Sequence, residues 1–268
     1  LKEAEFYYLK AIQLNPNLGI AHSNLGTIYR DLGKLKEAEF YYLKAIQLNP
    51  NLSIAFYCLT SLKLNNTNTI WRNQLFSENL LKNKSQEEQI NIYFARANIL
   101  HQEQNYVESS KYLKLANKSK LDLNPSKPNN LINKFKELLI ESDKKEILKK
   151  ENKNYYENIF IVGMPRSGST LVESILSMRN DVYDLGESNF LDESFIECIN
   201  SRQDMNLAEV YIKKVNNKTK LKIITNKDLY NFQYAGIIAN QIPNAKIIHC
   251  FRNPLDNILS IYRAYFAN

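Results

Sequence analysis

The chain has 268 residues, of which 44% are hydrophobic and 24% are charged, so it can bury a core and is not intrinsically disordered. Its net charge of +7 suggests polyanionic ligands without choosing among a nucleotide, a nucleic acid and an acidic peptide. No apolar run approaches the ~18 residues that a membrane-spanning helix needs. The three cysteines stand apart, at no spacing typical of a metal or redox pair, which favours thiols in a reducing, cytoplasmic compartment.

The N-terminal segment contains an internal repeat. The eighteen residues LKEAEFYYLKAIQLNPNL occur at 1–18 and again at 35–52, an offset of 34 residues. Pro16 and Pro50 end the second helix of each unit, because proline lacks an amide donor and clashes with the preceding turn. A period of 34 is typical of tetratricopeptide helix pairs, and this segment closely resembles that family.

Weaker helical patterns continue to residue 123. Residues 71–82 predict one further helix, and residues 90–123 predict a worn helix pair. We therefore interpret 1–123 as a helical solenoid that is clear over 1–52 and degenerate over 53–123. Such a solenoid can serve as a peptide-binding groove or as a structural spacer.

The pattern changes after the repeats. The Asn and Pro residues of NPSKPNN predict a loop, and the apolar spacing of 131–150 predicts a connecting helix, so we assign 124–154 to a linker and this helix. Alternation of strands and helices follows and predicts a parallel α/β domain over 155–268. The predicted fold class is thus α + α/β, a helical solenoid followed by an α/β domain.

A glycine-bounded loop joins a predicted strand to a predicted helix. The run NIFIV at 158–162 favours a buried parallel strand, and the apolar pattern of LVESIL at 171–176 predicts a helix. Between them lie Gly163, Met164, Pro165, Arg166, Ser167, Gly168, Ser169 and Thr170. A helix N-terminus behind such a loop is the arrangement in which backbone amides wrap a phosphate. The sequence therefore predicts a P-loop-like anion site.

The loop differs from a Walker A loop at the position that distinguishes the two kinds of nucleotide site. The lysine that reaches the β- and γ-phosphates in G-x-x-x-x-G-K-[ST] is replaced by Ser169, and Arg166 supplies the cation inside the loop. An ATP-dependent kinase would lack a main charge on the transferred phosphate. The loop instead resembles the 5′-phosphosulfate loop of sulfotransferases that use 3′-phosphoadenosine 5′-phosphosulfate (PAPS). The resemblance implies that the 5′ end of PAPS is bound by Pro165, Arg166, Ser167, Gly168, Ser169 and Thr170.

Two further motifs follow in the order of that family. A predicted buried strand at 245–251 runs into RNPLDNILSIYR, which resembles the family's 3′-phosphate motif and implies Arg252 and Ser260 as its phosphate ligands. An arginine at a strand end can donate a bidentate pair of hydrogen bonds to a phosphate. A third strand at 221–225 is followed by Lys227, which by resemblance contacts the oxygens of the transferred sulfuryl group.

Sulfuryl transfer to a hydroxyl also needs a base. Gly186 and Glu187 match the location at which tyrosylprotein sulfotransferases carry their acidic base, so the resemblance implies that Glu187 takes this role. Those enzymes carry two adjacent glutamates and a nearby arginine, whereas Glu187 is followed by Ser, Asn and Phe. The departure bears on tyrosine as the acceptor more than on sulfotransfer. His249, on a strand interpreted as central, is expected to be a core residue or a support for the site.

The resemblance implies a PAPS-dependent sulfotransferase with Arg166, Lys227 and Glu187 as its catalytic residues and without a metal. The expected acceptor is a protein tyrosine, on a protein or peptide that the repeats can present. We expect no nucleic-acid partner. The alternatives are a carbohydrate or small-molecule acceptor, a P-loop kinase, and a repeat scaffold without activity.

The first and last residues of the chain lead to further expectations. Residue 1 is a leucine inside a repeat, which leaves open further repeats or a signal peptide before it. Family members continue beyond the 3′-phosphate helix, so the resemblance implies a domain that is incomplete at its C-terminal end. Repeats followed by such a domain resemble a bacterial architecture.

Overall fold

The computed structural model describes residues 1–62, 70–144, 156–201 and 205–265, and the chain divides into two compact units. The first unit comprises Leu1–Ser126 with Tyr262–Asn268, and the second comprises Lys127–Ile261. No helix within the described ranges is long and apolar enough to cross a membrane.

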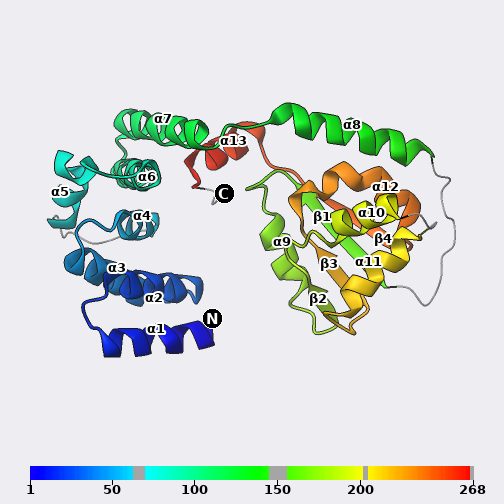
Figure 1. Cartoon of the computed structure of the whole chain (residues 1–268), viewed down its shortest axis with the longest axis horizontal. Coiled ribbons are helices and arrows are strands. Elements are labelled where there is room, and N and C mark those ends of the chain that lie inside the picture. The colour runs from blue at the N-terminus through cyan, green and yellow to red at the C-terminus, as the bar shows by residue number, and fades with distance from the viewer. Residues whose placement is uncertain (63–69, 145–155, 202–204, 266–268) are drawn as a thin grey trace. The chain divides into compact units, whose positions relative to one another are not determined.

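The first unit is a stack of helices that follow one another in chain order (Figure 1). Its helices are α1 (Lys2–Leu14), α2 (Gly19–Asp31), α3 (Leu35–Leu48), α4 (Ser53–Ser61), α5 (Ile70–Phe76), the 3₁₀ helix η1 (Glu78–Leu81), α6 (Gln86–Gln102) and α7 (Tyr106–Leu123). Gly26 on α2 lies against the buried ring of Tyr42 on α3, where an added Cβ would stand 2.8 Å from the ring carbons. Close approach of these two helices therefore requires glycine at this position.

The single helix predicted over 71–82 is wrong, because two shorter helices occupy this stretch. Ser77 adopts an extended conformation between α5 and η1, and its side chain accepts a hydrogen bond from the backbone N–H of Asn79. A serine in this role starts a new helix, since its hydroxyl satisfies an N–H that has no partner within the helix. The helix pair predicted over 90–123 is present as α6 and α7.

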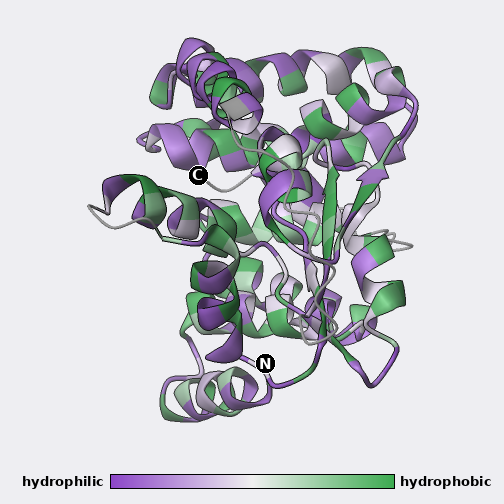
Figure 2. Cartoon of the chain, turned by 90° about the vertical axis from the view of Figure 1, so that its right-hand side faces the viewer, coloured by the Kyte–Doolittle hydropathy of each residue, from purple (hydrophilic) through white to green (hydrophobic). Residues whose placement is uncertain are grey.

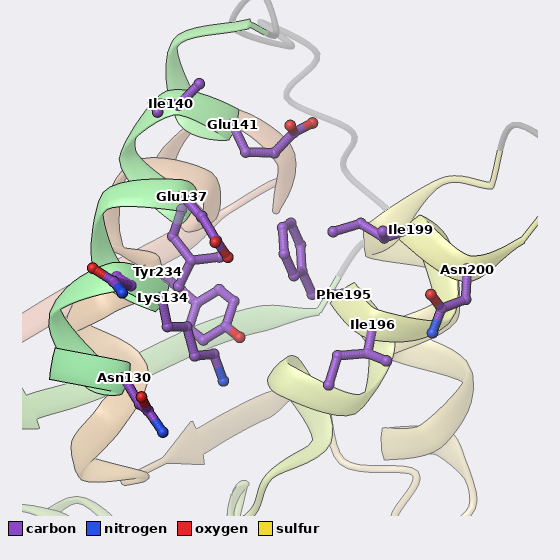
Figure 3. Close-up of a pocket in the computed structure, with 12 residues that line it drawn as sticks. Asn130, Lys134, Glu137, Ile140, Glu141, Phe195, Ile196, Ile199, Asn200 and Tyr234 are labelled. Atoms are coloured by element: carbon purple, nitrogen blue, oxygen red, sulfur yellow. The ribbon is translucent and has the colours of Figure 1, made fainter. Parts of the chain in front are cut away.

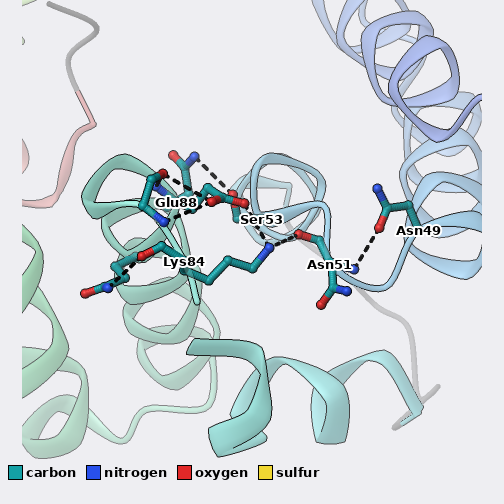
Figure 4. Close-up of polar contacts among 8 residues, drawn as sticks. Asn49, Asn51, Ser53, Lys84 and Glu88 are labelled. Atoms are coloured by element: carbon teal, nitrogen blue, oxygen red, sulfur yellow. Dashed lines mark hydrogen bonds and ion pairs between the residues drawn. The ribbon is translucent and has the colours of Figure 1, made fainter. Parts of the chain in front are cut away.

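A lysine joins the turn after α3 to the start of α6 (Figure 4). Lys84 Nζ donates to the backbone oxygen of Asn51 at 2.7 Å and to Glu88 Oε1 at 2.8 Å. Ser85 and Glu88 form a capping box, in which each side chain accepts a hydrogen bond from the backbone N–H of the other. These polar contacts fix the start of α6 on the preceding repeat.

The second unit is a four-stranded parallel sheet with helices packed against it (Figure 1). The strand order is β2-β3-β1-β4. Its elements are α8 (Pro128–Lys144), β1 (Glu157–Gly163), α9 (Ser169–Leu176), β2 (Val182–Asp184), α10 (Phe190–Asn200), α11 (Leu207–Asn216), β3 (Ile223–Asn226), the 3₁₀ helix η2 (Leu229–Tyr234), α12 (Ala235–Gln241), β4 (Ala245–Cys250) and α13 (Pro254–Arg263), whose last residues extend into the first unit.

The two faces of this sheet bury different clusters. On one face Phe160 of β1 and Ile224 of β3 pack with apolar residues of α8, α10, α11 and α12. On the other face Ile159 and Ile161 of β1 pack with residues of α9. The alternation follows from the two-residue period of a strand. Green and purple residues likewise alternate along the helical ribbons of Figure 2, as expected of amphipathic helices.

The helix predicted over 131–150 is observed as α8, from Pro128 to Lys144. It packs with the second unit, because Leu138 is buried in the sheet core and the backbone oxygen of Ser142 accepts a hydrogen bond from Asn240 of α12. The contacts thus group α8 with the α/β unit rather than with a linker. The predicted end of this helix and residues up to 155 lie outside the described residues.

The strand predicted at 245–251 is present as β4, but the predictions that it is buried and that His249 has a central position are wrong. In the described sheet β4 pairs only with β1 and lies at the edge, and His249 and Ile247 are exposed. The apolar run AKIIHCF has the composition of a buried strand, but composition does not tell which strand stands at the edge. Cys250 at the end of β4 is buried, and burial raises the pKa of its thiol.

Candidate functional site

The loop between β1 and α9 is held in shape by two glycines. At Gly163, with φ of 152°, an added Cβ would stand 2.5 Å from the backbone oxygen of Cys250 and 2.9 Å from Ser167 Oγ. Gly168, with φ of 100°, is the N-cap residue of α9. Both backbone conformations strongly favour glycine. The loop therefore turns tightly and directs the first amides of α9, which have no partners within the helix, to one side.

Arg166 adopts the left-handed conformation, with φ of 69°. For a residue with a Cβ this conformation costs about 1–2 kcal/mol. Strain of this kind collects at ligand-binding sites, where the surrounding structure enforces it. The exposed side chain of Arg166 donates from Nε to Ser260 Oγ at 3.3 Å.

The structure brings the loop and the RNPLDNILSIYR segment together. Arg252 donates from Nη1 to the backbone oxygen of Arg166 at 3.3 Å. Asn257 of α13, which is buried, donates from Nδ2 to the backbone oxygen of Pro165 at 2.8 Å. The sequence analysis missed Asn257, although its place between Arg252 and Ser260, on the helix that carries Ser260, was a signal. Three predicted binding residues, Arg166, Arg252 and Ser260, thus lie in one network.

The loop fits an anionic ligand by its own unsatisfied groups. Ser167 Oγ is buried without a hydrogen-bond partner among the residues that the structure describes. Ser169 is buried at the first position of α9, and Thr170 follows it on the surface. A buried hydroxyl without a partner is costly unless a ligand uses it. Together with the free amides and Arg166, this hydroxyl makes a site suited to a phosphate or sulfate group.

Glu187 and Lys227 form an ion pair just after two strands of the same sheet, β2 and β3. Lys227 Nζ lies 2.6 Å from Glu187 Oε1, with the lysine side chain 6% exposed and the glutamate side chain 65% exposed. The two residues follow β2 and β3, which are paired in parallel, and the N–H of Lys227 donates to the backbone oxygen of Gly186 at 2.8 Å. Because β3 also pairs in parallel with β1, the phosphate loop and this ion pair both lie at the carboxyl-terminal ends of the strands.

Comparisons with known proteins agree with this architecture. Residues 19–52 match the tetratricopeptide repeat family, and residues 156–268 match the sulfotransferase domain family. The chain therefore joins a tetratricopeptide repeat to a sulfotransferase domain. An uncharacterized protein of Aquifex aeolicus (strain VF5) is 34% identical in an alignment 131 residues long, and the match covers 41% of this chain and 17% of that protein. The chain thus matches only about a sixth of the length of this relative. The predicted architecture and the α + α/β fold class are confirmed.

The sulfotransferase domain contains a buried carboxylate that the sequence analysis missed. Glu173 of α9 is 5% exposed, and its Oε1 accepts a hydrogen bond from Thr225 Oγ1 at 3.0 Å. Burial raises the pKa of this carboxyl group above its ordinary value. Two of the apolar residues used to predict α9 do not lie on its buried side, since Leu171 is 65% and Ile175 is 56% exposed. A glutamate one turn after Ser169, on the same side of the helix, was the signal for this site.

One cavity of the second unit lies beside the loop, and another lies away from it. An open cavity of about 660 Å³ is lined by residues of the loop, β4 and η2, among them Pro165, Tyr230, Phe232 and His249. Another, of about 670 Å³, lies between Lys134, Glu137 and Ile140 of α8 and Phe195, Ile196 and Ile199 of α10 (Figure 3). Only the first cavity includes a predicted site residue. Within the described residues no group of three or more His, Cys, Asp or Glu side chains could hold a metal ion.

Proposed function

We propose that this chain transfers a sulfuryl group from PAPS to an acceptor hydroxyl, for which a protein tyrosine is the first candidate. The observation that carries the proposal is the network of Arg166, Arg252 and Ser260 around a loop whose Ser167 hydroxyl is buried without a partner among the described residues. Two arginines and a helix N-terminus suit a nucleotide with phosphates at both ends of its ribose.

PAPS, when bound, supplies an activated sulfuryl group on its 5′-phosphate. The first amides of α9 and the hydroxyls of Ser167, Ser169 and Thr170 bind this end of the nucleotide. Arg252 and Ser260 bind the 3′-phosphate. Ser169 leaves no lysine at the position where a Walker A loop contacts a γ-phosphate, which supports phosphosulfate over ATP.

The ion pair supplies the proton transfer and the positive charge. Glu187 is the more exposed partner and takes the proton of the acceptor hydroxyl. Lys227, held in place by burial, stabilises the negative charge that builds on the leaving phosphate. Arg166 adds a second positive charge inside the loop.

The acceptor approaches from the side of the open cavity next to Pro165. Tyr230 and Phe232 contribute aromatic rings to this cavity, which supports an acceptor with an aromatic ring. The tetratricopeptide repeat supports a protein acceptor, because helix-pair solenoids present extended binding surfaces. Sulfotransfer to a carbohydrate or small molecule would use the same PAPS site.

Isothermal titration calorimetry with three nucleotides tests the proposal. We expect adenosine 3′,5′-bisphosphate, the product of sulfuryl transfer, to bind at least tenfold more tightly than adenosine 5′-phosphate. ATP with magnesium should bind more weakly than the bisphosphate. A preference for ATP would favour a kinase, and no binding of any of the three would favour a scaffold; either result contradicts the proposal.

A further inference from the structure

The carboxylate of Glu173 stands where the phosphosulfate loop, β2 and β3 meet. Its Oε1 accepts a hydrogen bond from the hydroxyl of Thr225 at 3.0 Å, and the nearby backbone N–H of Gly186 favours the charged form of the carboxylate. Gly186 directly precedes Glu187, and Thr225 stands two residues before Lys227. One side chain of α9 therefore interacts with both segments that carry the ion pair.

The backbone joins these two segments at the same place. The N–H of Leu185 donates to the backbone oxygen of Thr225 at 2.9 Å, and the N–H of Lys227 donates to that of Gly186 at 2.8 Å. Gly186 has φ of 63°, the left-handed conformation of a tight turn. The position of this turn decides where Glu187 points. Without Glu173, α9 would lose its hydrogen bond to Thr225 and the attraction between its carboxylate and the N–H of Gly186.

Burial of this charge is expensive, and packing does not explain it. Val172 and Leu176, which flank Glu173 on α9, pack against the apolar cluster of β1 and β4. An apolar residue at 173 would fit such surroundings at less cost than a carboxylate. The charge has a counterpart in Lys227, whose buried ammonium group attracts it. Asp184 also acts on Glu173, and it repels.

We propose that Glu173 is a positioning residue that ties α9 to the Gly186 turn and to Thr225. It thereby sets Glu187 and Lys227 relative to the phosphosulfate loop. The inference rests on the proposed sulfotransfer function, because it concerns the base and the cation assigned to that reaction. It adds a residue that does not itself touch the reacting groups.

Hydrogen–deuterium exchange of Glu173→Gln tests the positioning without any assay of activity. The glutamine side chain of this variant can still accept a hydrogen bond from Thr225, but its amide group offers no carboxylate oxygen to the N–H of Gly186. We expect exchange of the amides of Gly186 and Lys227 to accelerate about tenfold, while the amides of Phe160 and Ile161 in β1 stay within about twofold. Glu197→Gln, an exposed change of the same chemistry on α10, should alter none of these rates.

Steady-state kinetics with PAPS and a phenolic acceptor give the second readout. Glu173→Gln should lower kcat at least tenfold, with the dissociation constant of adenosine 3′,5′-bisphosphate changed less than threefold. Thr225→Val, which removes the hydroxyl that donates to Glu173, should also lower kcat while leaving the dissociation constant of the bisphosphate within threefold.

Two results would overturn the inference. One is unchanged exchange at Gly186 in Glu173→Gln, and the other is faster exchange throughout β1, which would indicate a general structural role. Failure of the proposed function has a different signature: the unmodified protein would bind no bisphosphate and transfer no sulfuryl group. The exchange experiment would still decide whether Glu173 positions the turn.

Discussion

At Arg166 the backbone and the side chain have opposite preferences. The left-handed conformation favours glycine, yet the residue carries the guanidinium group that reaches Ser260. In this conformation the backbone oxygen of Arg166 also accepts a hydrogen bond from Arg252. The loop thus accepts local strain where a positive charge must stand close to a bound anion.

Comparison of Arg166→Gly with Arg166→Ala separates the two effects. Both variants remove the guanidinium, so both should weaken binding of adenosine 3′,5′-bisphosphate by about tenfold or more. Only glycine relieves the backbone, so the glycine variant should be about 1 kcal/mol more stable than the alanine variant in urea unfolding. Equal stabilities would contradict the strain, and unchanged binding would contradict the role of the charge.

Arg252 is expected to recognise the 3′-phosphate. Arg252→Ala should weaken binding of adenosine 3′,5′-bisphosphate by about tenfold to a hundredfold, the range of a charge-assisted contact of about 1.5–3 kcal/mol. Binding of adenosine 5′-phosphate should change less than threefold in the same titration. Arg179→Ala removes an exposed arginine that pairs with Asp181 and serves as the control. Equal losses for both nucleotides would place Arg252 elsewhere in the site.

The buried Glu173 should also appear in the pH dependence of stability. Because its pKa is raised in the folded protein, its favourable contribution is complete below the ordinary value of 4.5 and is lost as the pH rises through the folded value. The stability of the unmodified protein relative to Glu173→Gln should therefore fall as the pH rises above 4.5 and through the folded value, by at most about 1.4 kcal/mol per pH unit. Urea unfolding at several pH values measures it, and a constant or rising difference would contradict the assignment.

The sequence predicted the loop residues and missed those that support them. Glycine spacing and the Arg–Ser pair belong to contiguous motifs, which a single sequence displays. Glu173 and Asn257 act through partners 52 and 92 residues away, Thr225 and Pro165, so a local pattern can point to these residues but does not show their contacts. The ion pair between Glu187 and Lys227 likewise depends on the pairing of β2 with β3.

At the scale of elements, helix ends are decided by single polar side chains. Ser77 separates α5 from η1, and Ser85 begins α6 with a capping box. Apolar periodicity shows that helices occur in these stretches but does not show where a capping serine divides them. Apolar periodicity likewise predicts the helix α9 but not which of its sides is buried. The apolar side chains of Leu171 and Ile175 are in fact exposed.

Removal of the cap at Ser85 should destabilise the repeat unit. Ser85→Ala leaves the N–H of Glu88 without its acceptor and should cost about 1 kcal/mol in the free energy of unfolding. Ser110→Ala on α7 is the matched control, because that hydroxyl donates within its own helix to the oxygen of Val107. Urea unfolding followed by circular dichroism measures both variants, and an equal effect of the two changes would contradict the capping role.

At the scale of the whole molecule, the repeat and the parallel sheet were both predictable, because each has its own period. A period of 34 residues and strand–helix alternation are visible in the sequence alone. The edge position of β4 and the membership of α8 in the second unit were not visible, since strand order and helix docking depend on contacts between distant residues. Each unit buries its own clusters of apolar residues.

Because each unit has its own core, we expect the two units to respond separately to nucleotide binding. All the residues proposed to bind PAPS belong to the second unit, so adenosine 3′,5′-bisphosphate should stabilise that unit alone. At a hundred times its dissociation constant the gain is about 2.7 kcal/mol, which corresponds to a rise of several degrees in the unfolding midpoint of the second unit. Differential scanning calorimetry measures the two transitions, and Ser85→Ala identifies the one that belongs to the repeats, because it should lower that transition alone. If the nucleotide raised both midpoints equally, the two units would unfold as one, and the independence of their cores would be wrong.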